Sequence, residues 1–145
     1  MKWMILLLLF SCASQYKAIN PTHMKDGKPV YSSSERLGEL TVLESRGKDL
    51  HVMIKNTSDQ PLTIDLNLAT QKLKSEKKTS YAQSYWHESC GTKEESCEDP
   101  RVILKSKESI EVHWNFDHYG MGRFNLPLKK NEGIVDVFNI QFQSL

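Results

Sequence analysis

Apolar and polar residues alternate along most of the chain after Glu39. The clearest case is residues 62–68, where leucine or isoleucine at every second position alternates with Thr63, Asp65 and Asn67. A period of two places neighbouring side chains on opposite faces of a β-strand, so each such segment predicts a strand with one buried face. No long segment has the helical period of about 3.6 residues. The pattern therefore predicts an all-β protein.

The predicted strands are short and are separated by turns or loops. They are expected at residues 39–43, 50–55, 62–68, 81–87, 102–104, 110–116 and 134–142, with a long loop at 117–133. Val30 and Tyr31 are compatible with a further short edge strand. Because each strand has one apolar face, a second sheet must cover that face. The pattern therefore favours an antiparallel β-sandwich or a small barrel.

The first twelve residues have the pattern of an export signal. Lys2 precedes eight apolar residues, 3–10, whereas a membrane-spanning helix needs about twenty. A short apolar run behind a positive charge is typical of a secretory signal peptide. Its end, Leu9-Phe10-Ser11-Cys12, resembles the lipobox of bacterial lipoproteins. The resemblance implies diacylglycerol on the Cys12 thiol and cleavage just before Cys12; an ordinary signal peptide cut nearby is the alternative.

The signal divides the chain into three parts. We expect a signal peptide at residues 1–11, a lipidated N-terminus with a flexible tether at 12–36, and the folded domain at 37–145. The tether is expected because residues 13–35 are polar, with turn signals at Asn20-Pro21 and Asp26-Gly27. Two or more acyl chains on Cys12 would anchor the protein stably in a membrane. In a Gram-negative bacterium, the lack of Asp directly after Cys12 would indicate the outer membrane.

The cysteine count agrees with lipidation. The chain has three cysteines, an odd number that would be unusual in a secreted protein. Lipidation of Cys12 leaves Cys90 and Cys97, which are separated by six residues. In an oxidising envelope this pair is expected to form a structural disulfide. A redox or metal-binding pair is the rival interpretation, for which the closer Cys-x-x-Cys spacing would be typical.

Two segments resemble bacterial immunoglobulin-like domains. Residues 50–66 consist of an apolar strand, the turn Asn-Thr-Ser-Asp-Gln-Pro and a second apolar strand. Residues 103–114 have the order leucine, turn, glutamate-serine, alternating strand and tryptophan, with Ser106-Lys107 in place of the usual Pro-Gly. Small envelope lipoproteins and BsuPI-type proteinase inhibitors carry such domains. The resemblance implies an antiparallel immunoglobulin-like β-sandwich, here of about six to seven strands, and a non-catalytic role; it carries over no functional residue.

Composition and motifs argue against several function classes. The chain has 145 residues, with 19 basic and 18 acidic side chains, so its charge gives no reason to expect nucleic-acid binding. It lacks the Gly-x-Ser-x-Gly nucleophile motif, the His-Glu-x-x-His zinc motif and the glycine-rich loops that bind phosphate or dinucleotides. The sequence therefore predicts a protein that is not an enzyme and uses no cofactor.

Two aromatic segments are candidate binding loops. The candidate residues are Tyr85, Trp86 and His87 in the first segment and His118, Tyr119 and Arg123 in the second. Loops on a rigid scaffold often bind partners, and interface cores favour Tyr, Trp and Arg. The alternative is that these aromatic side chains are buried beneath the loops.

A metal site is a further possibility for the second segment. Imidazole and thioether ligands from His113, His118 and Met121 would suit copper in an oxidising envelope. Their spacing matches no established ligand set, however, and His113 is more simply a residue on the solvent face of a strand.

Together these features predict a lipid-anchored envelope lipoprotein that binds another envelope protein without catalysis. One alternative is a proteinase or hydrolase inhibitor that uses an aromatic or disulfide loop as a plug. A copper- or zinc-binding lipoprotein is the other.

Overall fold

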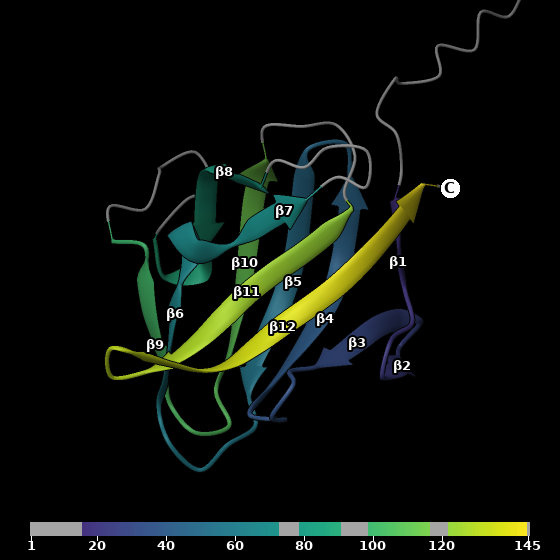
Figure 1. The fold of residues 1–145 in the computed structure, drawn as a ribbon. Helices are drawn as coiled ribbons and strands as arrows, with labels where there is room; N and C mark the ends of the chain where they lie inside the picture. The colour runs from purple at the N-terminus through teal and green to yellow at the C-terminus, as the bar shows by residue number, and fades with distance from the viewer. Residues whose placement is uncertain (1–15, 73–78, 91–98, 117–121, 145) are drawn as a thin grey trace, which may run out of the picture.

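The computed structural model describes residues 16–72, 79–90, 99–116 and 122–144. These residues form twelve strands, paired antiparallel, and two short 3₁₀ turns (Figure 1). The strands are β1 (Tyr16–Ile19), β2 (His23–Lys25), β3 (Lys28–Ser32), β4 (Gly38–Arg46), β5 (Asp49–Asn56), β6 (Leu62–Asp65), β7 (Thr70–Lys72), β8 (Thr79–His87), β9 (Arg101–Leu104), β10 (Ser109–Phe116), β11 (Arg123–Lys130) and β12 (Gly133–Ser144). The turns are η1 (Leu66–Leu68) and η2 (Glu88–Cys90). In the described ranges no helix is long and apolar enough to cross a membrane.

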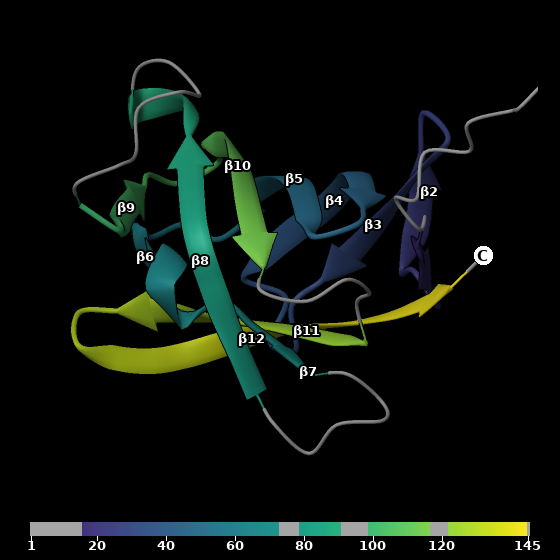
Figure 2. The same ribbon diagram turned by 90° about the horizontal axis from the view of Figure 1, so that it is seen from above.

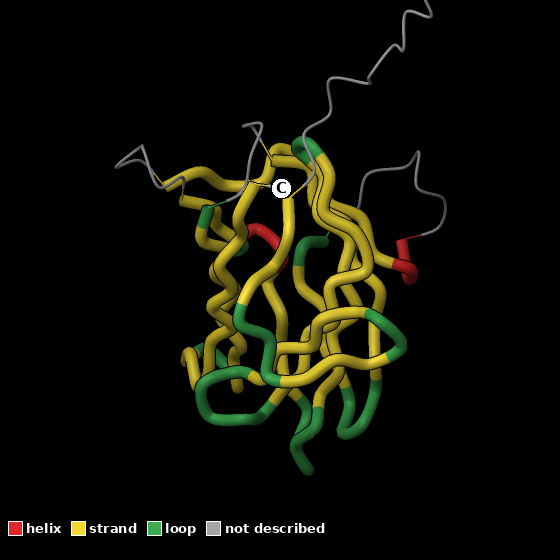
Figure 3. The backbone as a smooth tube through the Cα atoms, turned by 90° about the vertical axis from the view of Figure 1, so that its right-hand side faces the viewer, coloured by secondary structure: helices red, strands yellow, loops and turns green. Residues whose placement is uncertain are grey.

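The strands form two layers that are joined along one side. Sheet A has the order β2-β3-β4-β5-β10-β8. In sheet B, β11 lies between β12 on one side and both β6 and β7 on the other; β1 extends the sheet beyond β12, and β9 extends it beyond β6. Strand β8 pairs with β10 in sheet A and with β7 in sheet B, so it bends from one layer into the other (Figure 2). Opposite this junction, β1 and the β2–β3 hairpin lie at an open edge (Figure 3).

The core lies between the two sheets and follows from the alternation. In β10 every second side chain, from Ile110 to Phe116, is buried against the facing sheet. Trp114 of sheet A contacts Phe124 of sheet B with ring centroids 5.3 Å apart. The Trp114 indole also donates a 3.1 Å hydrogen bond to the Leu66 carbonyl. The aromatic residues of β10 and β11 therefore join the two layers.

The predicted fold class is confirmed, but the predicted number of strands was too low. All seven predicted strands form, although the segment at 62–68 ends as a strand at Asp65. There the Asp65 carboxylate accepts a 3.0 Å hydrogen bond from the backbone N–H of Asn67 and so caps η1. The immunoglobulin-like relationship stays a prediction.

Strand β11 was missed because its glycine- and proline-rich surroundings resemble a loop. Phe124, Leu126 and Leu128 nevertheless alternate and are buried. Pro127, which lacks a backbone N–H, lies between the stretch of β11 that pairs with β7 and the stretch that pairs with β6. A proline can therefore stand inside this strand without removing a hydrogen bond on that side.

The expected tether at residues 12–36 is wrong for its described part. Residues 16–32 form β1, β2 and β3, and the side chains of Ala18, Val30 and Tyr31 are buried. Strand β1 pairs with residues 141–144 at the far end of the chain. The turn signals are real, but they separate strands: Asn20, Asp26 and Gly27 all have positive φ. The folded domain therefore begins at or before residue 16.

Candidate functional site

A groove of about 720 Å³ lies at the open edge of the sandwich, between β1, the β2–β3 hairpin and the end of β4. This volume is in the range of small-molecule sites. About half of the residues that line it are apolar; they include Ile19, Pro21, Met24, Pro29 and Leu43. Met24 is one of the few large apolar side chains that the described residues leave exposed, at 58%. The groove therefore offers uncovered apolar surface.

Side-chain hydrogen bonds hold β1 over this groove. The Tyr31 hydroxyl donates to the Ile19 carbonyl at 2.8 Å, and the Ser45 hydroxyl donates to the Tyr16 carbonyl at 2.5 Å. Burial raises the pKa of Tyr31 to about 12, so its hydroxyl keeps the donated proton at physiological pH. These contacts connect the edge strand of sheet B to sheet A.

The hairpin that forms the opposite wall is set by its turn. Asp26 and Gly27 have φ values of 51° and 75°. Two consecutive residues with positive φ are what a two-residue type I′ hairpin requires, and Asp-Gly is a favoured pair there. The turn joins β2 and β3 in the register that brings Met24 opposite Pro29. Both residues line the groove.

The charge of the groove is positive. Three basic side chains, Lys17, Lys28 and Arg46, line it together with one acidic side chain, Glu44. All four are exposed. The Lys28 ammonium lies 3.3 Å from the Leu43 carbonyl, which places its charge beside an apolar residue of the groove. An apolar surface with a basic rim suits a ligand that is both apolar and anionic.

The outer face of sheet A carries two paired histidines. His51 and His113 lie opposite each other on β5 and β10, with ring centroids 5.7 Å apart. His51 contacts the Glu111 carboxylate, and the His113 Nε2 lies 3.3 Å from the Asp49 carboxylate. Asp49 also accepts a 2.8 Å hydrogen bond from the Asn115 amide. Each imidazole therefore already has a carboxylate partner.

The metal candidates gain no support from the described part of the chain. There, no group of three or more His, Cys, Asp or Glu side chains could hold a metal ion. His113 is paired with Asp49, while His118 and Met121 lie outside the described residues.

The structure describes all three candidate residues of the first binding segment and only Arg123 of the second. Tyr85, Trp86 and His87 lie in β8 rather than in a loop, and His87 is only 8% exposed. Burial lowers the pKa of His87, against the opposing effect of Asp99 and Glu88. Tyr85 is partly buried and packs against the core.

Arg123 lies far from Trp86 along the sheet. It is exposed at the start of β11, opposite Lys72, which in turn pairs with Thr79 at the other end of β8. Seven residues of strand, roughly 23 Å, separate Thr79 from Trp86. His118, Tyr119, Cys97 and Cys12 lie outside the described residues, so the disulfide from Cys90 to Cys97 and the lipidation stay predictions.

A buried serine–carboxylate pair was missed at the level of sequence. The Ser33 hydroxyl donates to the Asp136 carboxylate, which also accepts from the amides of Glu35 (2.8 Å), Leu37 (3.0 Å) and Val137 (2.8 Å). Burial alone would raise the pKa of Asp136, but these hydrogen bonds outweigh it and lower the pKa. The sequence does contain one indication of this site. Asp136 lies two and four positions before the buried Phe138 and Ile140, so the alternation of a strand places its side chain on the same inward face. The pair holds the β3–β4 loop on β12.

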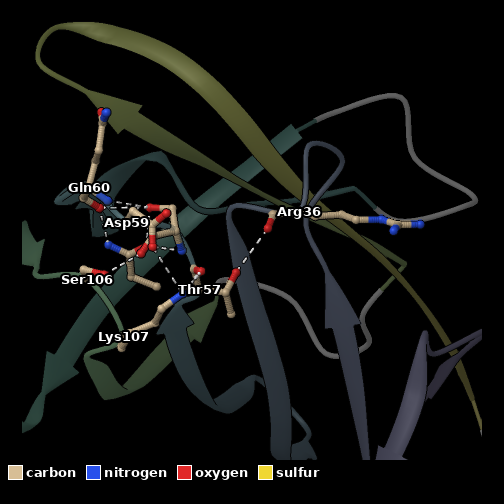
Figure 4. A network of polar contacts seen from close by, with 8 residues as sticks. Arg36, Thr57, Asp59, Gln60, Ser106 and Lys107 are labelled. Carbon is tan, nitrogen blue, oxygen red and sulfur yellow. Dashed lines mark hydrogen bonds and ion pairs between the residues drawn. The ribbon is translucent and has the colours of Figure 1, made fainter.

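A second polar network lies near the start of β4, at the end of this strand that is farther from the groove (Figure 4). The backbone N–H of Asn56 donates to the backbone carbonyl of Glu108 at 2.9 Å, and the backbone N–H of Lys107 donates to the backbone carbonyl of Asn56 at 2.8 Å. Side chains add to it: the Lys107 ammonium contacts the Thr57 carbonyl at 2.5 Å, and the Thr57 hydroxyl donates to the Arg36 carbonyl at 3.1 Å. The two segments that resemble immunoglobulin-like domains are thus bonded to each other, in a structural role.

No family model matches the chain, and no curated protein and no solved structure matches it either. Any assignment of function therefore rests on the chain's own residues, among which the groove at the open edge is the candidate binding site.

Proposed function

We propose that this protein is a lipid-anchored lipoprotein of the bacterial cell envelope that acts as a non-catalytic binding module. Its anchor is a set of acyl chains on Cys12, in the outer membrane of a Gram-negative bacterium, and its partner is another envelope component. The observation that carries the binding role is the groove at the open edge, which is apolar, bordered by basic side chains and already formed.

The position of the groove supports a role close to a membrane. Tyr16, which lines the groove, follows Cys12 by four residues. Four residues span at most about 14 Å even when fully extended. An acylated Cys12 would therefore keep Tyr16 within that distance of the lipid surface, at a groove that the exposed Lys17 and Arg46 also line.

The polar pairs of the described residues favour structural roles over catalysis. Asp136 already accepts hydrogen bonds from loop amides, and Ser33 also accepts one from the Gly38 amide at 2.9 Å. A general base must be free to take a proton from a substrate, and this carboxylate is held by its donors. We include in the proposal a structural disulfide between Cys90 and Cys97, as expected in an oxidising envelope.

The test compares the native chain with a Cys12→Ser variant in cells. Fractionation is expected to find the native chain in the membrane and the variant in the soluble fraction. Crosslinking followed by mass spectrometry is expected to enrich one envelope component with the native chain and not with the variant. A native chain found in the soluble fraction would contradict the anchor.

The same experiment tests the groove with two matched substitutions. Leu43→Glu places a charge in the groove and is expected to abolish the enrichment. Ile134→Glu makes the same kind of change at a side chain that is 63% exposed and not among the groove residues, and it is expected to have no effect. Equal enrichment with all three chains would contradict a binding role for the groove, and substrate turnover by the purified protein would contradict a non-catalytic one.

A further inference from the structure

We propose that the groove binds one acyl chain of an anionic lipid, with the anionic head group at the basic rim. This inference names the ligand class of the binding site proposed above and rests on that proposal. It follows from three features of the described residues: the apolar surface of the groove, the positive charge of its rim, and the hydrogen bonds that the β1 carbonyls already accept.

The apolar surface fits a hydrocarbon chain. Five apolar residues line the groove: Ile19 of β1, Pro21 of the β1–β2 loop, Met24 of β2, Pro29 of β3 and Leu43 of β4. The unbranched, flexible Met24 can adapt to a chain of variable shape, and its side chain is 58% exposed. A ligand that removed these side chains from water would be stabilised by the hydrophobic effect.

The rim adds selectivity for an anion. Lys17, Lys28 and Arg46 outnumber Glu44 among the side chains of the groove. The Lys28 ammonium, 3.3 Å from the Leu43 carbonyl, would lie next to a carboxylate or phosphate whose acyl chain contacts Leu43. A neutral lipid of the same length would bury the same hydrocarbon and gain none of this attraction.

The backbone of β1 disfavours a peptide strand as the occupant. Addition of a strand requires free carbonyl groups along a sheet edge. In two of the four β1 residues, Tyr16 and Ile19, the carbonyl already accepts a hydrogen bond, from the Ser45 and Tyr31 hydroxyls respectively. An acyl chain needs no backbone hydrogen bonds, so it fits the groove without disrupting these contacts.

The test uses the full chain with Cys12→Ser, so that no covalently attached acyl chain can occupy the groove. Fluorescence of bound cis-parinarate is followed while laurate displaces it, with dodecanol as the neutral analogue of the same length. Saturable displacement is expected, with laurate binding at least about tenfold more tightly than dodecanol. Absence of saturable displacement, or equal binding of the two ligands, would overturn the proposal.

Paired variants locate the site. Met24→Glu is expected to weaken laurate binding by about tenfold or more, and Lys28→Glu by about fivefold. Ile134→Glu and Lys25→Glu are the matched controls, because Ile134 and Lys25 are exposed and not among the groove residues; both are expected to bind as the parent chain does. Equal affinities for groove variants and controls would overturn the proposal even if laurate binds, and circular dichroism verifies that each variant is folded.

Vesicles distinguish the source of the lipid. Flotation with phosphatidylglycerol vesicles and not with phosphatidylcholine vesicles would identify a membrane lipid as the ligand, whereas laurate binding without flotation would identify a free fatty acid. Both results support an anionic acyl ligand. Because these experiments use the Cys12→Ser chain, their failure leaves the proposed anchoring intact. A native chain found in the soluble fraction of cells would contradict the anchor without affecting the laurate result.

Discussion

Asp136 shows how a single charged residue can stabilise an apolar core. Its side chain is in phase with Phe138 and Ile140 and is only 4% exposed, where an unpaired charge would be strongly unfavourable. Four donors compensate for the lost water: the Ser33 hydroxyl and the amides of Glu35, Leu37 and Val137. Because Ser33 follows β3 of sheet A and Asp136 lies in β12 of sheet B, the carboxylate links the two sheets.

We expect Asp136→Ala to lower the free energy of unfolding by about 3 kcal/mol, because it leaves several buried donors without an acceptor. Urea unfolding followed by tryptophan fluorescence measures this change. Glu132→Ala, at an exposed position in the neighbouring turn, is the control and is expected to have little effect.

The lowered pKa of Asp136 adds a pH dependence: the stabilisation is complete above the ordinary value of 3.8 and is lost as the pH falls below it towards the folded-state pKa. The difference between the native chain and Asp136→Asn should therefore shrink in that acidic range, and a difference independent of pH would contradict this role.

Gly38 decides how closely the elements approach at the start of β4. An added Cβ would lie 3.0 Å from Phe138 Cζ and 3.1 Å from Leu128 Cδ1, with the Lys55 carbonyl oxygen at 3.3 Å. Phe138 and Leu128 belong to sheet B, whereas Gly38 and Lys55 belong to sheet A. A residue without a side chain thus allows the two sheets to meet at this point.

We expect Gly38→Ala to reduce stability by about 1–3 kcal/mol, because the extra methyl group overpacks the contact between the sheets. Gly133→Ala is a matched control, since the nearest atom to its added Cβ, the Lys130 carbonyl oxygen, is 3.9 Å away. Thermal unfolding of both variants makes the comparison. Equal melting temperatures for the two would show that the sheets can separate at Gly38 without loss.

At the scale of the whole molecule, the two ends of the described chain are held side by side. Strand β1 pairs with the last residues of β12, Tyr16 opposite Ser144 and Ile19 opposite Gln141. This pairing makes β1 part of the domain and leaves the groove between β1 and β4. The binding site and the stability of the domain therefore depend on the same four-residue strand.

We expect a chain that begins at residue 20 to be less stable than one that begins at residue 16 by about 2 kcal/mol or more. The shorter chain loses the burial of Ala18 and the pairing of β1 with residues 141–144 of β12. It also removes the carbonyls to which Tyr31 and Ser45 donate. Denaturant unfolding compares the two chains, and equal midpoints would restore the flexible tether that the sequence predicted.

The sequence by itself determined the class of the fold and the inward face of most strands, because alternation is a local property. The burial of Trp114, Phe116 and Ile140 follows from their spacing within β10 and β12. The same spacing could not reveal β11, where Pro127 resembled a loop signal, or β1, which has four residues.

Only the tertiary structure decided which strands are neighbours and hence where a site can form. Except for its local bond to Val137, the hydrogen bonds of Asp136 join residues that are 99 to 103 positions away in the sequence. Strand β1 likewise pairs with residues at the other end of the described chain. The groove likewise combines β1 with β4 and the β2–β3 hairpin. The physical reason is that a residue pattern records which side of a strand avoids water, whereas the partner of a strand edge depends on how all the strands pack together.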